Sequence, residues 1–250
     1  MSNESNDLSF MQSTIAFFID TMRDASLDSI DESGLQLAAE SPKYKIKVAA
    51  TSAERKPAHM LIDRMYSGRG YETRGALDHE PNKMTLVAYS NDKAVGTLSV
   101  RKDSFLGLFA DEMYHEELND LRKSGCRICE FTGLAIDPEI KSKGLLASMI
   151  HVAYLYHFRI LGITDGVLEV NPRHVKFYES MLDLDRIGPE RMCLRANAPS
   201  VLLRANFPYM AEQIRKYGGF AAKPLGRKSL YPYFFPYEME SLIISRMSSC

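Results

Sequence analysis

Residues 129–146 pass from a predicted strand into a basic loop and then into a helix, a pattern suited to binding an anion. The strand ends at Pro138, and the helix begins near Gly144. Backbone N–H groups at the start of a helix bind anions, helped by the helix dipole, and Lys141 and Lys143 add positive charge. A pyrophosphate or a phosphopantetheine phosphate would fit this loop, although an ordinary turn with two solvated lysines gives the same pattern.

A second stretch, residues 169–182, places an amide at the end of a strand and a phenol on the helix that follows. Asn171 lies where the strand stops, and Tyr178 lies on the helix. A tyrosine in this position serves either as a proton donor or, more commonly, as a half-buried part of a core. The sequence pattern by itself favours the second interpretation.

The elements that must position these residues alternate between strand-like and helix-like patterns. Strands are expected over residues 44–49, 83–89, 94–100, 127–137 and 165–170, with two more within 184–204. Helices are expected over residues 8–22, 52–66, 111–124, 143–161, 174–182 and 207–217. This order predicts a mixed α/β domain, largely antiparallel in its first half, with a parallel pair of strands flanking the long helix.

The chain divides into three parts where its composition changes. Residues 1–42 hold the first predicted helix and an acidic, serine-rich linker, and residues 43–220 form the main domain. Residues 221–250 are rich in proline and aromatic residues, and no element is assigned to them. We expect this last segment to pack on the domain or to extend it.

The composition excludes several classes of function. The chain has 31 basic and 32 acidic residues and a formal net charge of −1, which argues against a nucleic-acid-binding protein. Four cysteines in 250 residues do not make a disulfide scaffold. Cys126 and Cys129 suit a redox pair, half a zinc site or two thiols at the start of a strand. The last is favoured because no second ligand pair follows, so no metal is expected.

The first predicted helix is informative about where in the cell the protein is located. The N-terminus lacks a basic segment, and the apolar part of residues 8–22 is too short and too polar to span a membrane or to act as a secretion signal. A helix docked on the core is favoured over contact with a membrane surface, which needs more basic residues on the polar face. The protein is therefore expected in the cytoplasm.

Together the two stretches resemble the GNAT acyltransferases. That superfamily has a loop patterned Gln/Arg-x-x-Gly-x-Gly/Ala. Gly144 matches its central glycine, whereas Lys141 and Leu146 replace the first and last residues. Asn171 and the Phe-Tyr-Glu sequence at residues 177–179 match a second motif. The resemblance implies a GNAT-like fold, a mixed central sheet with splayed strands flanked by helices.

A narrower resemblance covers residues 45–204. This part of the chain is similar to the N-acyl amino acid synthases, relatives of the acyl-homoserine-lactone synthases. The resemblance implies a long-chain acyl group carried by an acyl carrier protein and an amino acid acceptor. It implies no permanently bound cofactor, because the acyl-phosphopantetheine of the carrier protein or of coenzyme A is a co-substrate. The matching pieces are residues 96–100, 103–108, 111–118, 121–125, 129–135 and 171–178.

The resemblance also implies roles in catalysis. Glu130 would take a proton from the amine, since the related synthases also place a glutamate on the central strand; the alternative is a structural pair with an arginine. Backbone N–H groups from Leu134 to Ile136 would bind the oxyanion, and Tyr178 would protonate the departing sulfur. This arrangement requires Glu130 and Tyr178 on the same side of the sheet, beside one groove that reaches Gly144.

Binding roles follow from the same resemblance. The residues expected to hold phosphopantetheine are Leu134, Ile136, Lys141, Lys143, Gly144, Leu145 and Asn171. The candidates for pairing with the carboxylate of an amino acid are Arg69, Arg101, Arg173 and His174. Acyl carrier proteins are acidic, so a basic docking surface is expected, formed by Arg122, Lys123, Arg127, Lys141 and Lys143.

Three other functions remain open. The chain could be a GNAT enzyme that uses a short-chain acyl-coenzyme A. It could be a non-catalytic module that binds a carrier protein or another ligand. A membrane-peripheral scaffold that uses the first helix and the aromatic C-terminal segment is the weakest of the three.

Overall fold

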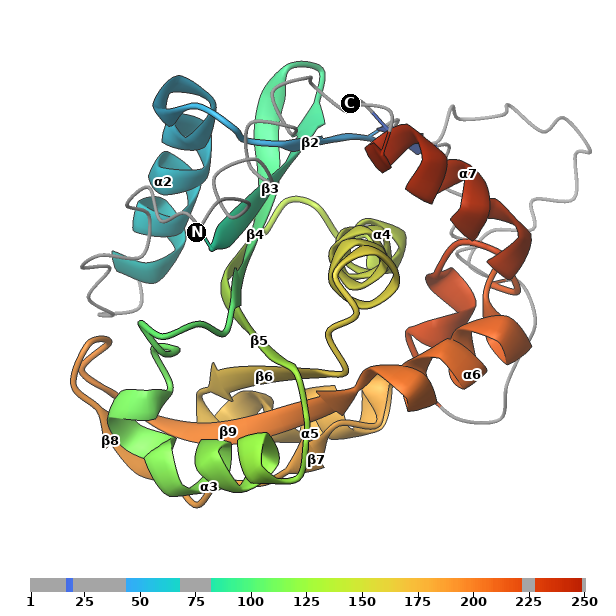
Figure 1. Cartoon of the computed structure of the whole chain (residues 1–250). Coiled ribbons are helices and arrows are strands. Elements are labelled where there is room, and N and C mark those ends of the chain that lie inside the picture. The colour runs from blue at the N-terminus through green and yellow to red at the C-terminus, as the bar shows by residue number, and fades with distance from the viewer. Residues whose placement is uncertain (1–16, 20–43, 68–81, 222–227, 249–250) are drawn as a thin grey trace, which may run out of the picture.

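The computed structural model describes residues 17–19, 44–67, 82–221 and 228–248 and shows a mixed α/β fold built on one large sheet (Figure 1). The strands are β1 (Phe17–Ile19), β2 (Tyr44–Val48), β3 (Lys83–Ser90), β4 (Lys93–Lys102), β5 (Ile128–Ile136), β6 (Asp165–Val170), β7 (Asp185–Arg186), β8 (Arg191–Cys193) and β9 (Ala198–Asn206). The helices are α2 (Ser52–Ser67), α3 (Asp111–Lys123), α4 (Lys143–Tyr154), η1 (Leu155–Ile160), α5 (Pro172–Leu182), α6 (Phe207–Tyr217), η2 (Tyr231–Tyr233) and α7 (Tyr237–Ser248). The mixed α/β class predicted from the sequence is confirmed.

The first half of the sheet is antiparallel, as predicted. Strand order is β1-β2-β3-β4-β5-β6-β9-β7, and β8 pairs with β9. Asn91 and Asp92 join β3 to β4 in left-handed backbone conformations, at φ values of 47° and 62°, as a two-residue hairpin turn requires. Thr51 caps α2, because its hydroxyl accepts from the Glu54 N–H while the Glu54 carboxylate accepts from the Thr51 N–H.

The predicted parallel pair consists of β5 and β6, and these strands separate partway along their length. They pair only from Ile128 opposite Asp165 to Glu130 opposite Val167. Beyond Glu130, β5 stays paired with β4, where its register shifts between Thr97 and Ser99. This irregularity contains Gly133, whose positive φ of 58° favours glycine. The two strands therefore splay at their carboxyl ends.

Helices cover both faces of the sheet. Figure 1 shows α4 end-on within the curve of the sheet, with α6 and α7 beyond it, while α2 and α3 lie outside the curve. Ile128 and Val167 of the paired strands pack with Leu118 of α3. The larger core lies on the α4 face, where Met149 and Leu155 pack with Leu203 of β9. The splay thus opens between two separately packed layers.

Two expectations about the elements need correction. Residues 17–19, inside the helix expected over 8–22, form strand β1, which pairs antiparallel with β2; the rest of that range lies outside the described residues. The aromatic and β-branched side chains there favour a strand once a sheet edge is available. The helix expected over 143–161 is α-helical only to Tyr154 and continues as the π-helix η1. The C-terminal segment, to which the sequence assigned no element, contains η2 and α7.

The C-terminal elements share the main core. Tyr231 and Phe234 are fully buried in the same cluster as Tyr154 and Phe207. His151 of α4 lies against Phe234 and Phe235 and contacts Glu240 of α7 at 3.3 Å. These contacts pack α7 against the outer side of α4 and η1. The division at residues 42 and 220 remains an expectation.

Candidate active site

A pocket of about 510 Å³ occupies the splay between β5 and β6. It crosses the sheet, so that its two ends have different chemistry. One end is polar and lies on the α3 face, and the other is apolar and lies on the α4 face. Residues lining the polar end include Phe109, Glu130, Thr132, Glu169 and Arg195, and those lining the apolar end include Phe131, Ile150, Leu168, Tyr178, Leu184 and Phe207.

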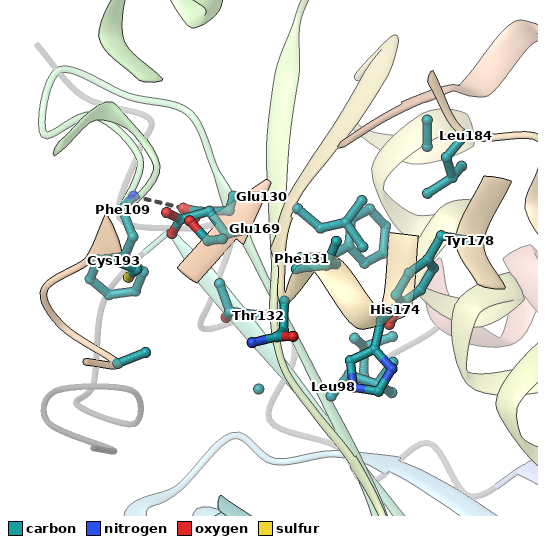
Figure 2. A pocket seen from close by; sticks show the side chains of 18 of the residues that line it. Leu98, Phe109, Glu130, Phe131, Thr132, Glu169, His174, Tyr178, Leu184 and Cys193 are labelled. Atoms are coloured by element: carbon teal, nitrogen blue, oxygen red, sulfur yellow. Dashed lines mark hydrogen bonds between the residues drawn. The ribbon is translucent and has the colours of Figure 1, made fainter. Parts of the chain in front are cut away.

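Glu130 is held at the start of α3. Its two carboxylate oxygens accept hydrogen bonds from the backbone N–H of Phe109, at 2.6 Å (Figure 2), and from that of Ala110, at 3.1 Å. The residue is only 1% exposed. Burial and the nearby charge of Glu169 raise the pKa of Glu130 to about 8, although the Phe109 amide and two arginines lower it.

Glu169 occupies the end of β6 on the same face as Glu130. One of its oxygens pairs with the Arg195 guanidinium, which also contacts Glu112 at 2.8 Å. Burial raises the pKa of the Glu169 carboxyl, while Arg195 lowers it. Arg101 lies opposite Glu130 on β4, and its guanidinium stacks 3.8 Å from the centroid of the Phe109 ring. The polar end therefore contains two carboxylates and two guanidinium groups within a buried setting.

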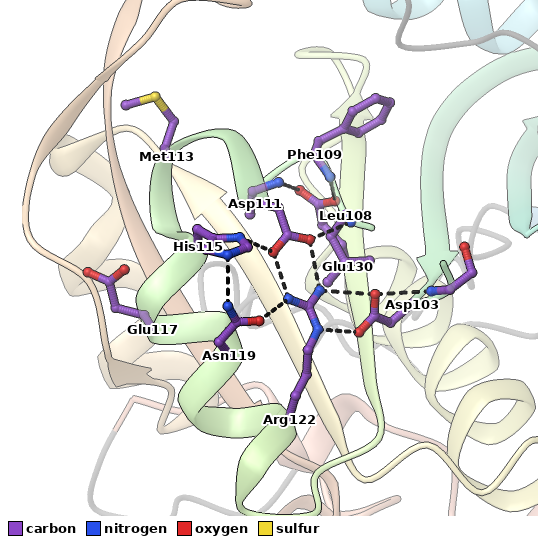
Figure 3. A network of polar contacts seen from close by, with 12 residues as sticks. Asp103, Leu108, Phe109, Asp111, Met113, His115, Glu117, Asn119, Arg122 and Glu130 are labelled. Carbon is purple, nitrogen blue, oxygen red and sulfur yellow. Dashed lines mark hydrogen bonds and ion pairs between the residues drawn. The ribbon is translucent and has the colours of Figure 1, made fainter. Parts of the chain in front are cut away.

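An ion-pair network fixes the segment that supplies Phe109. Arg122 donates to Asp103 and to Asp111, each at 2.7 Å, and Asp111 in turn accepts from the Leu108 N–H at 2.7 Å (Figure 3). These bonds tie the loop before α3 to the last turn of the same helix. The guanidinium of Arg122 is thus engaged with two aspartates, and its expected role in docking a carrier protein stays a prediction.

Tyr178 lies at the apolar end. Figure 2 shows it with His174 and Leu184 at one end of the pocket, while Glu130 and Glu169 lie at the other. Burial raises the pKa of Tyr178 to about 12, so the hydroxyl is protonated at neutral pH. The expectation that Glu130 and Tyr178 share one side of the sheet is not met. Alternation along β5 directs Glu130 toward α3, and Tyr178 packs with the core of the opposite face.

The other expected residues of the phosphopantetheine site are only partly brought together. Leu134 and Asn171 line the pocket. The Asn171 side chain accepts from the Arg173 N–H at 3.2 Å and so caps α5. Ile136, Lys141, Lys143, Gly144 and Leu145 are not among the lining residues, so the pocket does not extend to the start of α4. There the Ser142 hydroxyl accepts from the Leu145 N–H at 3.1 Å, and the Leu145 side chain is buried in the core.

Among the described candidates for pairing with an acceptor carboxylate, Arg173 and His174 lie together, with Nε of Arg173 donating to Nε2 of His174 at 3.1 Å, whereas Arg101 lies apart on β4. Arg69 lies outside the described residues. Arg101 lies beneath Phe109, His174 borders the apolar end, and Arg173 is exposed at the start of α5. The expected basic surface is also divided. Arg122, Lys123 and Arg127 are near the start of β5, whereas Lys141 and Lys143 follow its end.

Sequence reasoning missed Glu169 and Arg195 as site residues. Glu169 interrupts the apolar pattern of β6 at the point where the strand ends, which was the available signal. Arg195 follows β8 and reaches the pocket only through the pairing of β8 with β9. No local pattern shows that contact.

Within the described ranges, no group of three or more metal-ligating side chains is found, and Cys126, Cys129 and Cys193 are free thiols. The favoured interpretation of Cys126 and Cys129 as ordinary thiols agrees with the burial of Cys129 at the start of β5. In the same part of the chain, no helix combines the length and apolarity needed to cross a membrane.

Comparisons with known proteins agree with this geometry. A family model described as the N-acyl amino acid synthase FeeM matches residues 57–206. Among solved structures, the chain is similar to FeeM, an N-acyl amino acid synthase from uncultured soil microbes, with 23% identity and a TM-score of 0.61 over 69% of this chain and 96% of that one. No curated protein matches the chain. The similarity to FeeM shows a shared fold, and the expected GNAT-like arrangement with splayed strands is confirmed.

Two further structures are less similar. The acyl-homoserine-lactone synthase LasI has 13% identity and a TM-score of 0.49, over 67% of this chain and 91% of that one. An acyl-CoA N-acyltransferase from Pseudomonas aeruginosa has 13% identity and a TM-score of 0.46, over 66% of this chain and 99% of that one.

Proposed function

Since the chain belongs to the FeeM family of N-acyl amino acid synthases and is an N-acyltransferase, we propose that it transfers a long-chain acyl group from an acyl carrier protein to the amine of an amino acid. The observation that carries this proposal is a single pocket that joins an apolar end to a polar end across the splayed strands. A fatty acyl chain and an amino acid need these two environments, and the reaction joins them.

The apolar end suits the acyl chain. Phe131, Leu168 and Phe207 contribute side chains to it, and Ile150 closes it from α4. Removing an acyl chain from water into this lining supplies about 0.8 kcal/mol for each buried CH₂ group, so each added methylene favours the longer substrate while room remains.

The thioester arm would lie along the free edge of β5. Past Glu130, β5 has no strand partner on its β6 side in the described structure, and although the Leu134 carbonyl accepts from the Tyr66 hydroxyl at 3.0 Å, this edge offers backbone groups to a ligand. The amides of a phosphopantetheine arm can pair with such an edge, as an added strand does. A backbone N–H here would stabilise the oxyanion, and the protonated Tyr178 hydroxyl would donate to the departing sulfur.

The acceptor would bind at the polar end. Arg195 borders the pocket and offers a guanidinium for the carboxylate of an amino acid, while the carboxylate of Glu169 favours its ammonium group. Loss of one ammonium proton to solvent would leave the neutral amine that attacks the thioester, and a carboxylate of the polar end would take the proton released during attack.

Two features favour a carrier protein over free coenzyme A. Ser142 already satisfies the Leu145 N–H at the start of α4, which leaves fewer amides for a pyrophosphate. Lys141 and Lys143 are exposed after β5, and Arg173 is exposed after β6. Since β5 and β6 are parallel, these cations lie at the same edge as the mouth of the splay, where an acidic carrier protein would dock.

Mass spectrometry of reaction products tests the proposal. The purified protein is incubated with dodecanoyl-acyl carrier protein, dodecanoyl-coenzyme A or acetyl-coenzyme A and with each of the common amino acids. We expect N-dodecanoyl amino acids, formed most rapidly from the carrier-protein donor. Acetylated products alone would support a short-chain enzyme. Binding of the carrier protein without any amide product would support a non-catalytic module.

A further inference from the structure

The two carboxylates at the polar end differ in how their oxygens are used. Both oxygens of Glu130 accept from backbone N–H groups at the start of α3. A carboxylate in that position stabilises the helix terminus and holds the Phe109 segment in place. Both oxygens of Glu130 are therefore used in holding the α3 start, and its raised pKa of about 8 leaves this group mostly protonated near neutral pH, so it is poorly suited to take a further proton from a substrate.

Only one of the two carboxylate oxygens of Glu169 has a hydrogen-bond partner among the described residues. Arg195 engages Oε2, whereas Oε1 is buried and has no hydrogen-bond partner among the described residues. The side chain of Glu169 is 11% exposed and borders the pocket. A buried carboxylate oxygen without a partner is rare in proteins, because its desolvation is uncompensated, and it marks a position where a ligand donor is missing. Thr132, which also borders the pocket, has a buried hydroxyl in the same condition.

We propose that Glu169 is the general base of the reaction, taking the proton of the acceptor amine on Oε1, while Glu130 holds the α3 start and Arg195 fixes the orientation of the Glu169 carboxylate. This assignment rests on the proposed function. Alternation along β6 places Glu169 on the same face as Val167, whose partner in the parallel ladder is Glu130, so both carboxylates face the polar end.

The chemical step balances with these groups. The nitrogen of the neutral amine bonds to the thioester carbonyl carbon, and its proton passes to Oε1 of Glu169. The C–S bond breaks, and the sulfur leaves as a thiol after taking a proton from Tyr178 or from water. Once solvent restores Glu169 and Tyr178, the sum is one amide and one thiol.

The electrostatic setting supports this role. Burial raises the pKa of Glu169 above its ordinary value, which makes its carboxylate a stronger base. The charged groups that face it are Arg195, Glu112 and Glu130. Arg195 keeps the carboxylate ionised in part, so it is able to accept a proton.

Steady-state kinetics of three variants test the assignment. Glu169→Gln keeps the shape of the side chain and removes the base, and Glu130→Gln does the same for the second carboxylate. Glu112→Gln is the matched control, because Glu112 also pairs with Arg195 but is 56% exposed and outside the pocket lining. We expect kcat to fall by ~100-fold or more for Glu169→Gln, with an unchanged KM for the acyl donor, and by less than ~10-fold for the other two.

The reverse order, with Glu130→Gln inactive and Glu169→Gln active, would overturn the assignment and leave the proposed function intact. Wild-type protein that forms no amide from any donor and acceptor would overturn the function and the assignment together. If Glu169→Gln proves unstable in thermal unfolding, the activity of Glu169→Ala is measured instead, with and without added formate. Restoration of activity by formate supports a base at this position, and failure of the smaller carboxylate to restore it contradicts one.

Discussion

The burial of Glu130 makes a prediction about stability that does not depend on activity. Its pKa is 4.5 in a solvated chain and about 8 in the folded protein. Because the folded protein holds the proton more tightly, the stabilising contribution is fully present below pH 4.5 and is lost as the pH rises through about 8. Each unit of difference in pKa corresponds to about 1.4 kcal/mol, so raising the pH from 5 to 8 costs the folded protein about 4 kcal/mol at this residue.

Replacing Glu130 with glutamine removes this titration. The variant places an NH₂ group where one carboxylate oxygen accepted a backbone N–H, which costs about 1–3 kcal/mol at every pH. At pH 5 the variant is therefore expected to be less stable than the wild type. At pH 8 the difference in unfolding free energy between the variant and the wild type should have closed or reversed, because only the wild type has lost the stabilisation that protonated Glu130 provides.

Urea denaturation followed by circular dichroism, repeated at intervals from pH 5 to pH 8.5, measures the difference in unfolding free energy between the two proteins. The expected change in that difference is about 4 kcal/mol in favour of the variant. Glu179→Gln, an exposed substitution on α5, is the control and should change stability by less than about 0.5 kcal/mol throughout. A difference between Glu130→Gln and wild type that stays constant over this range would refute the reasoning, since Glu130 would then ionise in the folded protein as it does in the unfolded chain.

Three further outcomes are expected. Tyr178→Phe should lower kcat by ~100-fold without changing the melting temperature, because the pKa of about 12 keeps the hydroxyl protonated as a donor; unchanged kcat would exclude that role. Gly133→Ala should destabilise the fold by about 1–2 kcal/mol in calorimetry, since φ is +58° and the new methyl would lie 3.1 Å from Ile62, and an unchanged melting temperature would contradict this. Changing Lys141 and Lys143 together to Glu should raise KM for acyl carrier protein ~10-fold or more and leave KM for acyl-coenzyme A within ~3-fold; equal effects on both donors would argue against a docking surface.

Residue patterns along the chain determined most of the elements between Tyr44 and Tyr217. Alternating and helical periodicities identify β2, the β3–β4 hairpin and α3 close to their observed bounds, because each is set by which side chains must be buried. The same approach did not find η2, whose aromatic and proline residues are buried through contacts with α4 and α6. It also left α7 unassigned, although the buried Glu240, Ile243 and Met247 recur there at helical spacing. It also predicted a helix across residues 17–19, where the free edge of β2 selects a strand.

The residues of the candidate site were also determined partly by the sequence and partly by the tertiary structure. Motif spacing singled out Glu130, Leu134, Asn171 and Tyr178, and all four line the pocket. Their separation into two ends was decided by the tertiary structure. The two faces of β5 and β6 become different environments only when α3 packs on one side and α4 on the other. The roles of Glu169 and Arg195 were likewise decided there.

A sequence shows which side chains are able to titrate or to form ion pairs. Which oxygen of a carboxylate is left without a partner depends on residues brought together from distant parts of the chain. Glu169 and Arg195 are separated by the whole of α5 and two short strands, and they meet only because β8 and β9 fold back beside β6.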